Sequence, residues 1–193
     1  MLRCRDTLDR GPTHGDLIIM QKLFAAVLLA AGVAVAAPST QAAEKPTDPQ
    51  IAHIAYTAGV IDINAAELAL KTSKNKDVLD FANNMLADHK AVNDKALALV
   101  KKLGVTPEDN DVSKSLRKNA DAEQAKLARL TGAAFDKAYA ANELAYHKAV
   151  NAALKDTLIP DATNTELKDL LAQGLQIFLG HQQHAEMIVG MLK

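Results

Sequence analysis

The sequence has no tryptophan, only 4% of its residues are aromatic, and its single cysteine is Cys4. Because Cys4 precedes the main apolar run, the chain after that run has no disulfide and no thiolate metal site. Most apolar residues are alanine and leucine, which favour helices, and β-branched residues are sparse. This composition argues against a β-sheet and predicts an all-α fold.

An excess of charge of one sign is also missing. The 22 Lys and Arg residues nearly balance the 23 Asp and Glu residues, which gives a net charge of −1, and no basic stripe is present. Nucleic-acid binding therefore has no electrostatic support. A Gly-rich phosphate loop is absent and serine is rare, so the sequence offers no phosphate-loop or Ser-His-Asp catalytic site. It favours a binding or stress-related module over an enzyme, and it leaves protein partners and the oligomeric state open.

The N-terminal region predicts export. Residues 1–19 are polar and irregular, and we interpret them as a mis-assigned or disordered extension, with Met20 as the start codon. Lys22 then precedes an apolar run over residues 23–37, which is too short for a comfortable membrane span. Small residues up to Ala42 follow, so residues 20–42 are a predicted secretory signal peptide cleaved near Ala42. An uncleaved anchor is the alternative. The predicted mature domain, residues 43–193, would be periplasmic or secreted, without a transmembrane segment.

Four long helices are predicted in residues 43–193. Apolar residues recur at steps of three and four, as they do on the buried face of a helix. In the first helix this stripe comprises Ile51, Ile54, Ala58, Ile61, Ala65 and Leu68. The predicted N-terminal caps are Asp48 (followed by Pro49), Asn75, Thr131 and Asn164. Gly104 should end the second helix, and the third should run from Ala133 to about Lys155 before Pro160 interrupts the chain.

The connection between the second and third helices is long and contains a charged, shorter helix over residues 112–130. An up-down-up-down bundle needs only short loops, whereas a ferritin-like bundle must carry the chain back along its length at this point. We therefore predict a ferritin-like four-helix bundle with a long middle connection that contains a short extra helix.

Several segments resemble a family of exported bacterial proteins, domain of unknown function 4142, across residues 51–188. The resemblance is carried by DVLDFANNMLADHKAVNDKALALVKKLGV, by LTGAAFDKAYAANELAYHKAVNAAL and by TELKDLLAQGLQIFLGHQQHAEMI. Its most recognisable positions are Asp88-His89, Phe135-Asp136, Ala138-Tyr139, His147 and His184. The residue before His147, usually acidic in this family, is Tyr146 here. The resemblance implies export and a ferritin-like fold, and no activity.

Histidines and carboxylates at core spacing suggest a metal site. The candidate ligands are Glu67, His89, Glu143, His147, His181 and His184. Imidazole and carboxylate together suit iron, zinc, manganese or copper. Counting helix rise from the predicted caps puts His89 and His147 roughly 21 and 24 Å below one end of the bundle. Glu67 and the two C-terminal histidines lie higher, so Glu143 with these residues would form an upper level and His89 with His147 a lower pair. As an alternative function, such ligands would make the protein a metal carrier or a metal-dependent redox protein.

A purely structural role for these histidines is the competing interpretation. Each would be hydrogen-bonded across the bundle to an asparagine, a tyrosine or a carboxylate, with Asn142, Asn151 and Tyr139 as plausible partners. The Glu-x-x-His pairs of ferritin-type di-iron centres are absent, which argues against a ferroxidase centre. Asp88 could support the neighbouring His89 or face solvent. The methionines Met85, Met187 and Met191 are interpreted as core-filling residues and not as a copper(I)-binding methionine group, because they are not clustered in sequence.

Overall fold

The computed structural model of the chain describes residues 45–192, so the predicted N-terminal extension and signal peptide lie outside the described residues. The described residues form helices and no strand. The long helices are α2 (Asp48–Thr72), α3 (Lys76–Leu103), α4 (Asp111–Leu127), α5 (Gly132–Ala153) and α7 (Thr165–Met191). A π-helical turn, η1 (Leu154–Leu158), and the short α6 (Ile159–Asp161) follow α5 directly. None of the helices in this part of the chain is long and apolar enough to cross a membrane.

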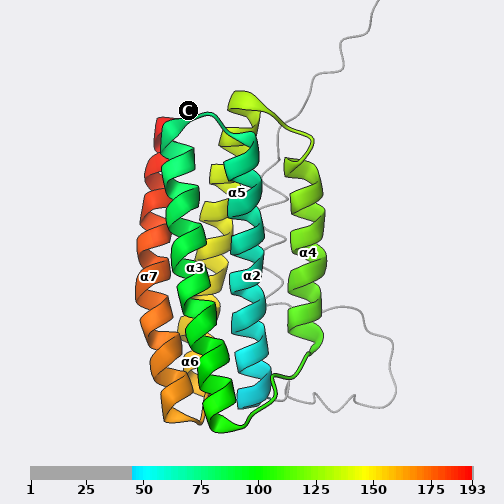
Figure 1. Cartoon of the computed structure of the whole chain (residues 1–193), viewed down its shortest axis with the longest axis vertical. Helices are drawn as coiled ribbons and strands as arrows, with labels where there is room; N and C mark the ends of the chain where they lie inside the picture. The colour runs from blue at the N-terminus through cyan, green and yellow to red at the C-terminus, as the bar shows by residue number, and fades with distance from the viewer. Residues whose placement is uncertain (1–44, 193) are drawn as a thin grey trace, which may run out of the picture. The chain divides into compact units, whose positions relative to one another are not determined.

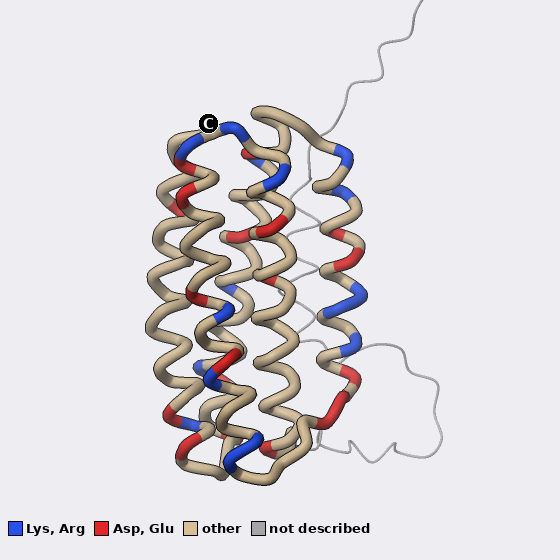
Figure 2. The backbone as a smooth tube through the Cα atoms, viewed as in Figure 1, with Lys and Arg blue, Asp and Glu red and all other residues tan. Residues whose placement is uncertain are grey.

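Helices α2, α3, α5 and α7 form a four-helix bundle in which α2 lies beside α3 and α5, and α7 lies beside the same two helices (Figure 1). Helix α4 packs on the outside of α2 and runs back along the length of the bundle. As a result α5 runs in the same direction as α3, and α2 in the same direction as α7. This is the predicted ferritin-like topology, with α4 as the extra helix. Lys, Arg, Asp and Glu alternate along α4 (Figure 2), as expected for a solvated face.

Short polar residues and a glycine set the helix ends largely as predicted. The Asn75 side chain accepts hydrogen bonds from the backbone N–H groups of Asp77 and Val78 at the start of α3. Gly104 ends the same helix in a left-handed conformation, with φ of 65°. At the start of α2 the cap is Thr47 rather than Asp48. The Asp48 carboxylate instead accepts hydrogen bonds from Thr163 and from the backbone of Asn164, which ties the starts of α2 and α7 together.

The chain beyond α5 differs from the prediction, because it stays helical through Pro160. In the π turn the N–H of Ile159 donates to the carbonyl of Leu154, five residues earlier. Pro160 has no N–H to donate, and the N–H of Ala162 then donates to Leu158 in the ordinary α pattern. The wider π turn accommodates the proline ring, which would otherwise clash with the preceding turn.

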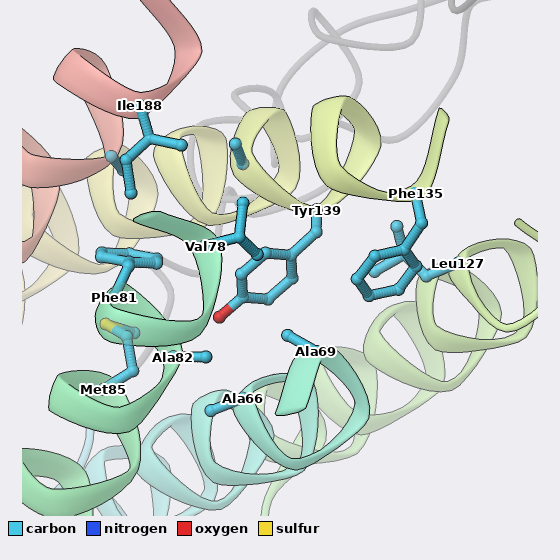
Figure 3. Packing of buried hydrophobic residues seen from close by; sticks show 12 residues of the cluster. Ala66, Ala69, Val78, Phe81, Ala82, Met85, Leu127, Phe135, Tyr139 and Ile188 are labelled. Atoms are coloured by element: carbon cyan, nitrogen blue, oxygen red, sulfur yellow. The ribbon is translucent and has the colours of Figure 1, made fainter. Parts of the chain in front are cut away.

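An apolar core fills the end of the bundle where α2 meets α3 (Figure 3). Phe81 and Phe135 both contact the ring of Tyr139, at centroid distances of 6.1 and 5.8 Å. Small residues on the facing helices allow the backbones to approach closely around these rings: Ala66, Ala69, Ala82 and Ala185. The core therefore holds the four helices together immediately above the polar residues at mid-bundle.

Candidate metal centre

Five ionisable side chains meet in the middle of the bundle, and every one of its four helices contributes. They are Asp62 from α2, His89 from α3, Glu143 and His147 from α5, and His181 from α7. Their exposed fractions lie between 1% and 6%. Residues of these types are rarely buried without a hydrogen-bond partner, a counter-charge or a metal ion. The cluster therefore needs a chemical explanation beyond packing.

The ligand-type atoms of these residues fall into two overlapping groups. One nitrogen from each of His89, His147 and His181 lies within 4.8 Å of the other two. Asp62, Glu143 and His147 form a second group that meets the same distance limit, so His147 belongs to both. The three imidazole rings lie at centroid distances of 5.2 to 5.7 Å from one another. Atoms at these separations can close around one ion with only small side-chain movements.

Neighbouring groups orient two of the histidines. The Nε2 atom of His181 lies 2.9 Å from a carboxylate oxygen of Asp88 on α3. The Nδ1–H of His147 donates to the backbone carbonyl of Glu143, one turn earlier in α5, at 3.0 Å. In metalloproteins a histidine ligand commonly donates its second N–H to a carboxylate or a carbonyl, which fixes the ring and the tautomer. Among the described residues, the other ring nitrogen of each histidine, Nδ1 of His181 and Nε2 of His147, has no hydrogen-bond partner. Phe178 stacks on His89 at 4.6 Å and holds the third ring.

The inward-facing atoms of the cluster have no hydrogen-bond partner anywhere in residues 45–192. They are Asp62 Oδ1, both nitrogens of His89, Glu143 Oε2, His147 Nε2 and His181 Nδ1. Native proteins satisfy the large majority of buried polar atoms, so six such atoms gathered in one place are unusual. The Oδ2 atom of Asp62 lies 3.5 Å from His89 Nε2.

The hydrogen bonds expected for purely structural histidines are present only in part: His181 bonds to the carboxylate of Asp88 on the facing helix α3, whereas the three named partners bond elsewhere. Asn142 donates to Glu143, and Asn151 donates to the carbonyl of Phe178 and to Gln182. The hydroxyl of Tyr139, which points toward Ala82 in Figure 3, is itself without a partner among the described residues. None of the three expected partners bonds to a cluster histidine in the part of the chain that the structure describes.

Comparison with known proteins places the chain in a family. The family model described as "Domain of unknown function (DUF4142)" matches residues 33–188. The chain belongs to the DUF4142 family. Searches of curated proteins and of solved structures gave no match. Because the family description names no activity, the chemistry of this DUF4142 protein has to be argued from the site itself.

Burial keeps the imidazoles in this DUF4142 protein neutral. It lowers the pKa of His89 to about 2, with a further contribution from the neighbouring His147 and His181. Burial, with His181 beside it, lowers the pKa of His147 to about 4. The pKa of His181 is also lowered by burial. Near neutral pH all three rings therefore keep the lone pair that a metal ion needs.

The two carboxyl groups are shifted in the opposite direction. Burial raises the pKa of Glu143 to about 8. Burial also raises the pKa of Asp62 well above its usual range, and the nearby Glu143 raises it further. Glu143 consequently holds its proton at neutral pH, and the shift of Asp62 acts in the same direction, so burial reduces the negative charge of the metal-free cluster. A divalent cation would replace the proton of Glu143 and make the carboxylates available as oxygen ligands.

Four of the six predicted ligands lie in the cluster, namely His89, Glu143, His147 and His181. Glu67 does not, because its side chain is 43% exposed and lies 3.7 Å from the ammonium group of Lys90. His184 is also outside, with its ring edge against Phe81 at a centroid distance of 5.0 Å. The prediction of two separate levels is corrected as well, since His181 lies with His89 and His147.

The direction of the helices explains why His181 reaches the lower level. Side chains on a helix lean toward its N-terminus. Helix α7 runs opposite to α3 and α5, so the side chain of His181 leans in the opposite direction to those of His89 and His147. The three side chains therefore converge on one level, although their Cα atoms start at different levels. Counting helix rise between Cα positions ignores this convergence of several ångströms.

Asp62 was not among the predicted ligands, because the predicted stripe on α2 loses the correct phase halfway along the helix. It continues from Ala58 to Ile61, whereas the structure buries Asp62 and leaves Ile61 half-buried. The buried positions 54, 58, 62 and 66 are four residues apart, and the predicted stripe changed to a step of three too early. The signal that could have identified this ligand was a carboxylate, Asp62, at one of the positions spaced four residues apart. Asp88, for which two roles were open, supports His181.

Proposed function

We propose that this protein is an exported binding protein that holds a divalent transition-metal ion at the centre of its bundle. The nitrogen ligands are His89, His147 and His181, and the carboxylates of Glu143 and Asp62 supply oxygen ligands. The observation that carries the proposal is the convergence of three histidine nitrogens within 4.8 Å, together with hydrogen bonds that hold two of the rings. A bound ion would give most of the unpaired atoms of the cluster a common partner, with one nitrogen from each histidine as a ligand.

The donor set narrows the chemistry of the ion. Imidazole nitrogen with carboxylate oxygen suits zinc, iron(II), manganese and copper(II), whereas calcium and magnesium prefer oxygen ligands alone. The set also differs from a ferritin-type di-iron centre, because position 86, three residues before His89, is a leucine and position 144, three before His147, is another. With ligands at most 6% exposed, the site favours retention of an ion over turnover of a large substrate.

The export part of the proposal depends on the N-terminal sequence. Lys22, the apolar run over residues 23–37 and the small residues before Ala43 have the order of a secretory signal peptide. In this proposal the mature protein acts in the periplasm or outside the cell. A carrier there would hold its metal without thiol ligands, since Cys4 precedes the cleavage site.

Thermal melting of chelator-treated, untagged protein tests the metal site. Zinc, iron(II), manganese and copper(II) are added separately at pH 7.5, with iron handled anaerobically. Binding at a free-ion concentration of 100 times Kd should stabilise the folded state by about 2.7 kcal/mol and raise Tm accordingly. His147→Gln should abolish the shift. His53→Gln, which changes a histidine of α2 outside the cluster, is the matched control and should keep it.

Two results would reject the metal site. Either no ion changes the melting temperature of the wild-type protein, or His53→Gln loses the shift to the same extent as His147→Gln. In both cases the three histidines would be packing residues.

A further inference from the structure

A pair of methionines lies on the surface of α7, contrary to the interpretation of all three methionines as core residues. Met187 and Met191 are each 59% exposed, more than any other large hydrophobic residue that the structure describes. Met85 is fully buried, as expected. Large apolar side chains on a surface usually indicate contact with another molecule or a ligand when they gather on one face.

The two methionines and a histidine share one face of α7. Met187 follows His184 by three residues, and Met191 follows Met187 by four, which are the spacings of neighbours on a helix surface. Because helical side chains lean toward the N-terminus, Met191 leans over Met187, and Met187 leans over His184. The thioether sulfurs and the imidazole are thereby directed into one short stretch of surface.

The ring of His184 has a fixed orientation, and its nitrogens are available to act as ligands. Phe81 of α3 meets the His184 ring edge to face, at 5.0 Å and 82°. Neither ring nitrogen of His184 takes part in a hydrogen bond within residues 45–192. His184 is also separate from the buried centre, to which His181 belongs. A half-buried ring with a fixed orientation and a free nitrogen is suited to act as a ligand.

We propose that His184, Met187 and Met191 form a second metal site, on the surface of the bundle, that binds copper(I). Thioether sulfur is a soft ligand that selects copper(I), and an imidazole nitrogen completes a low-coordinate site. All three donors are uncharged when His184 is neutral, which suits a monovalent ion better than a divalent one. The buried centre, with two carboxylates and three imidazoles, has the opposite preference. This proposal does not depend on the buried centre binding any metal.

Anaerobic titration of copper(I) against a chromophoric copper(I) chelator tests the surface site. The protein is the full chain with Cys4→Ser, which removes the only thiol. Removing side chains that bind the ion directly should lower the affinity by more than the 10- to 100-fold typical of a supporting residue. Met187→Leu/Met191→Leu should therefore bind copper(I) at least about 100-fold more weakly. Met85→Leu is the matched control, and its affinity should be unchanged. Repeating the comparison in a His147→Gln background removes any contribution from the buried centre.

X-ray absorption at the copper edge gives a second readout. Copper(I) on the parent protein should show sulfur neighbours, and the double leucine variant should show none. Leucine keeps the surface apolar, so a role in contact with another protein would survive the substitution while copper binding would not. The proposal is overturned if the double variant retains the affinity or the sulfur neighbours, or if Met85→Leu loses them equally.

Discussion

Glu143→Gln should separate the stability of the metal-free protein from its ability to bind metal. Glutamine has nearly the shape of a protonated glutamic acid and cannot ionise. In the folded protein burial raises the pKa of Glu143 to about 8, from its ordinary value of 4.5. The folded state therefore holds this proton more tightly than the unfolded state, and the contribution of Glu143 to stability is complete below pH 4.5. It is lost progressively as the pH rises toward 8.

The size of the effect follows from the shift. A pKa difference between 4.5 and about 8 corresponds to roughly 5 kcal/mol in full, of which roughly 4 kcal/mol appears between pH 5 and pH 9. The histidines act in the other direction below pH 6.5, because their folded pKa values are lowered. They are present in both proteins and cancel in the comparison. Relative to wild type, Glu143→Gln should gain stability steadily with pH.

Urea denaturation of chelator-treated protein at pH 5, 7 and 9 measures this difference. Glu67→Gln, a change to a half-exposed glutamate outside the cluster, is the control and should follow wild type at every pH. In the presence of the metal that stabilises wild type, Glu143→Gln should gain less, because it has lost a carboxylate ligand. A difference between wild type and Glu143→Gln that is the same at pH 5 and pH 9 would refute the assignment of a buried, protonated carboxyl group.

Three further outcomes are expected. Asp88→Asn should weaken metal binding by about 10- to 100-fold in a competition assay, because the Asp88 carboxylate holds His181 in place. It should change Tm little, since the carboxylate is 49% exposed, and an affinity equal to that of wild type would contradict this role. Tyr139→Phe removes a buried hydroxyl that has no partner among the described residues. Thermal melting should therefore find the metal-free variant equally stable or up to about 1 kcal/mol more stable, and a loss of several kcal/mol would show that the hydroxyl is paired. The intact mass of the exported protein should correspond to a chain beginning at Ala43, and a chain that retains Met20 would show that the segment is an anchor.

The fold was accessible from sequence because its determinants are local. Asn75, Gly104 and Asn164 mark helix ends through bonds or dihedral angles that depend on neighbouring residues alone. The topology followed from the length of one connection, which α4 now fills. The continuation through Pro160 was not accessible, because a π turn has no sequence signal comparable to a cap.

The site was accessible only in part, because its assembly depends on relations between helices. His89 and His147 were placed correctly, since each depends on the phase of its own helix over a short distance. Predicting Asp62 would have required the correct helical phase of α2 four turns from its start. At that distance, an error of one step in the spacing moves the predicted buried face by one residue. Predicting that His181 joins the other two histidines would have required the level and the direction of α7 relative to α3. No sequence pattern within α7 contains this information.

The position of the cluster bears on what metal binding does to this protein. A zinc finger has little core of its own and unfolds without its ion. Here the aromatic core around Phe81, Phe135 and Tyr139 lies next to the cluster and joins the same four helices. Burial also keeps the imidazoles neutral and Glu143 protonated in the metal-free cluster, which reduces the repulsion that would oppose folding. The metal-free protein should therefore fold, and the ion should add stability by mass action rather than create the fold. An ion that binds a folded cluster can also leave it without unfolding the bundle, which is the property that a carrier requires.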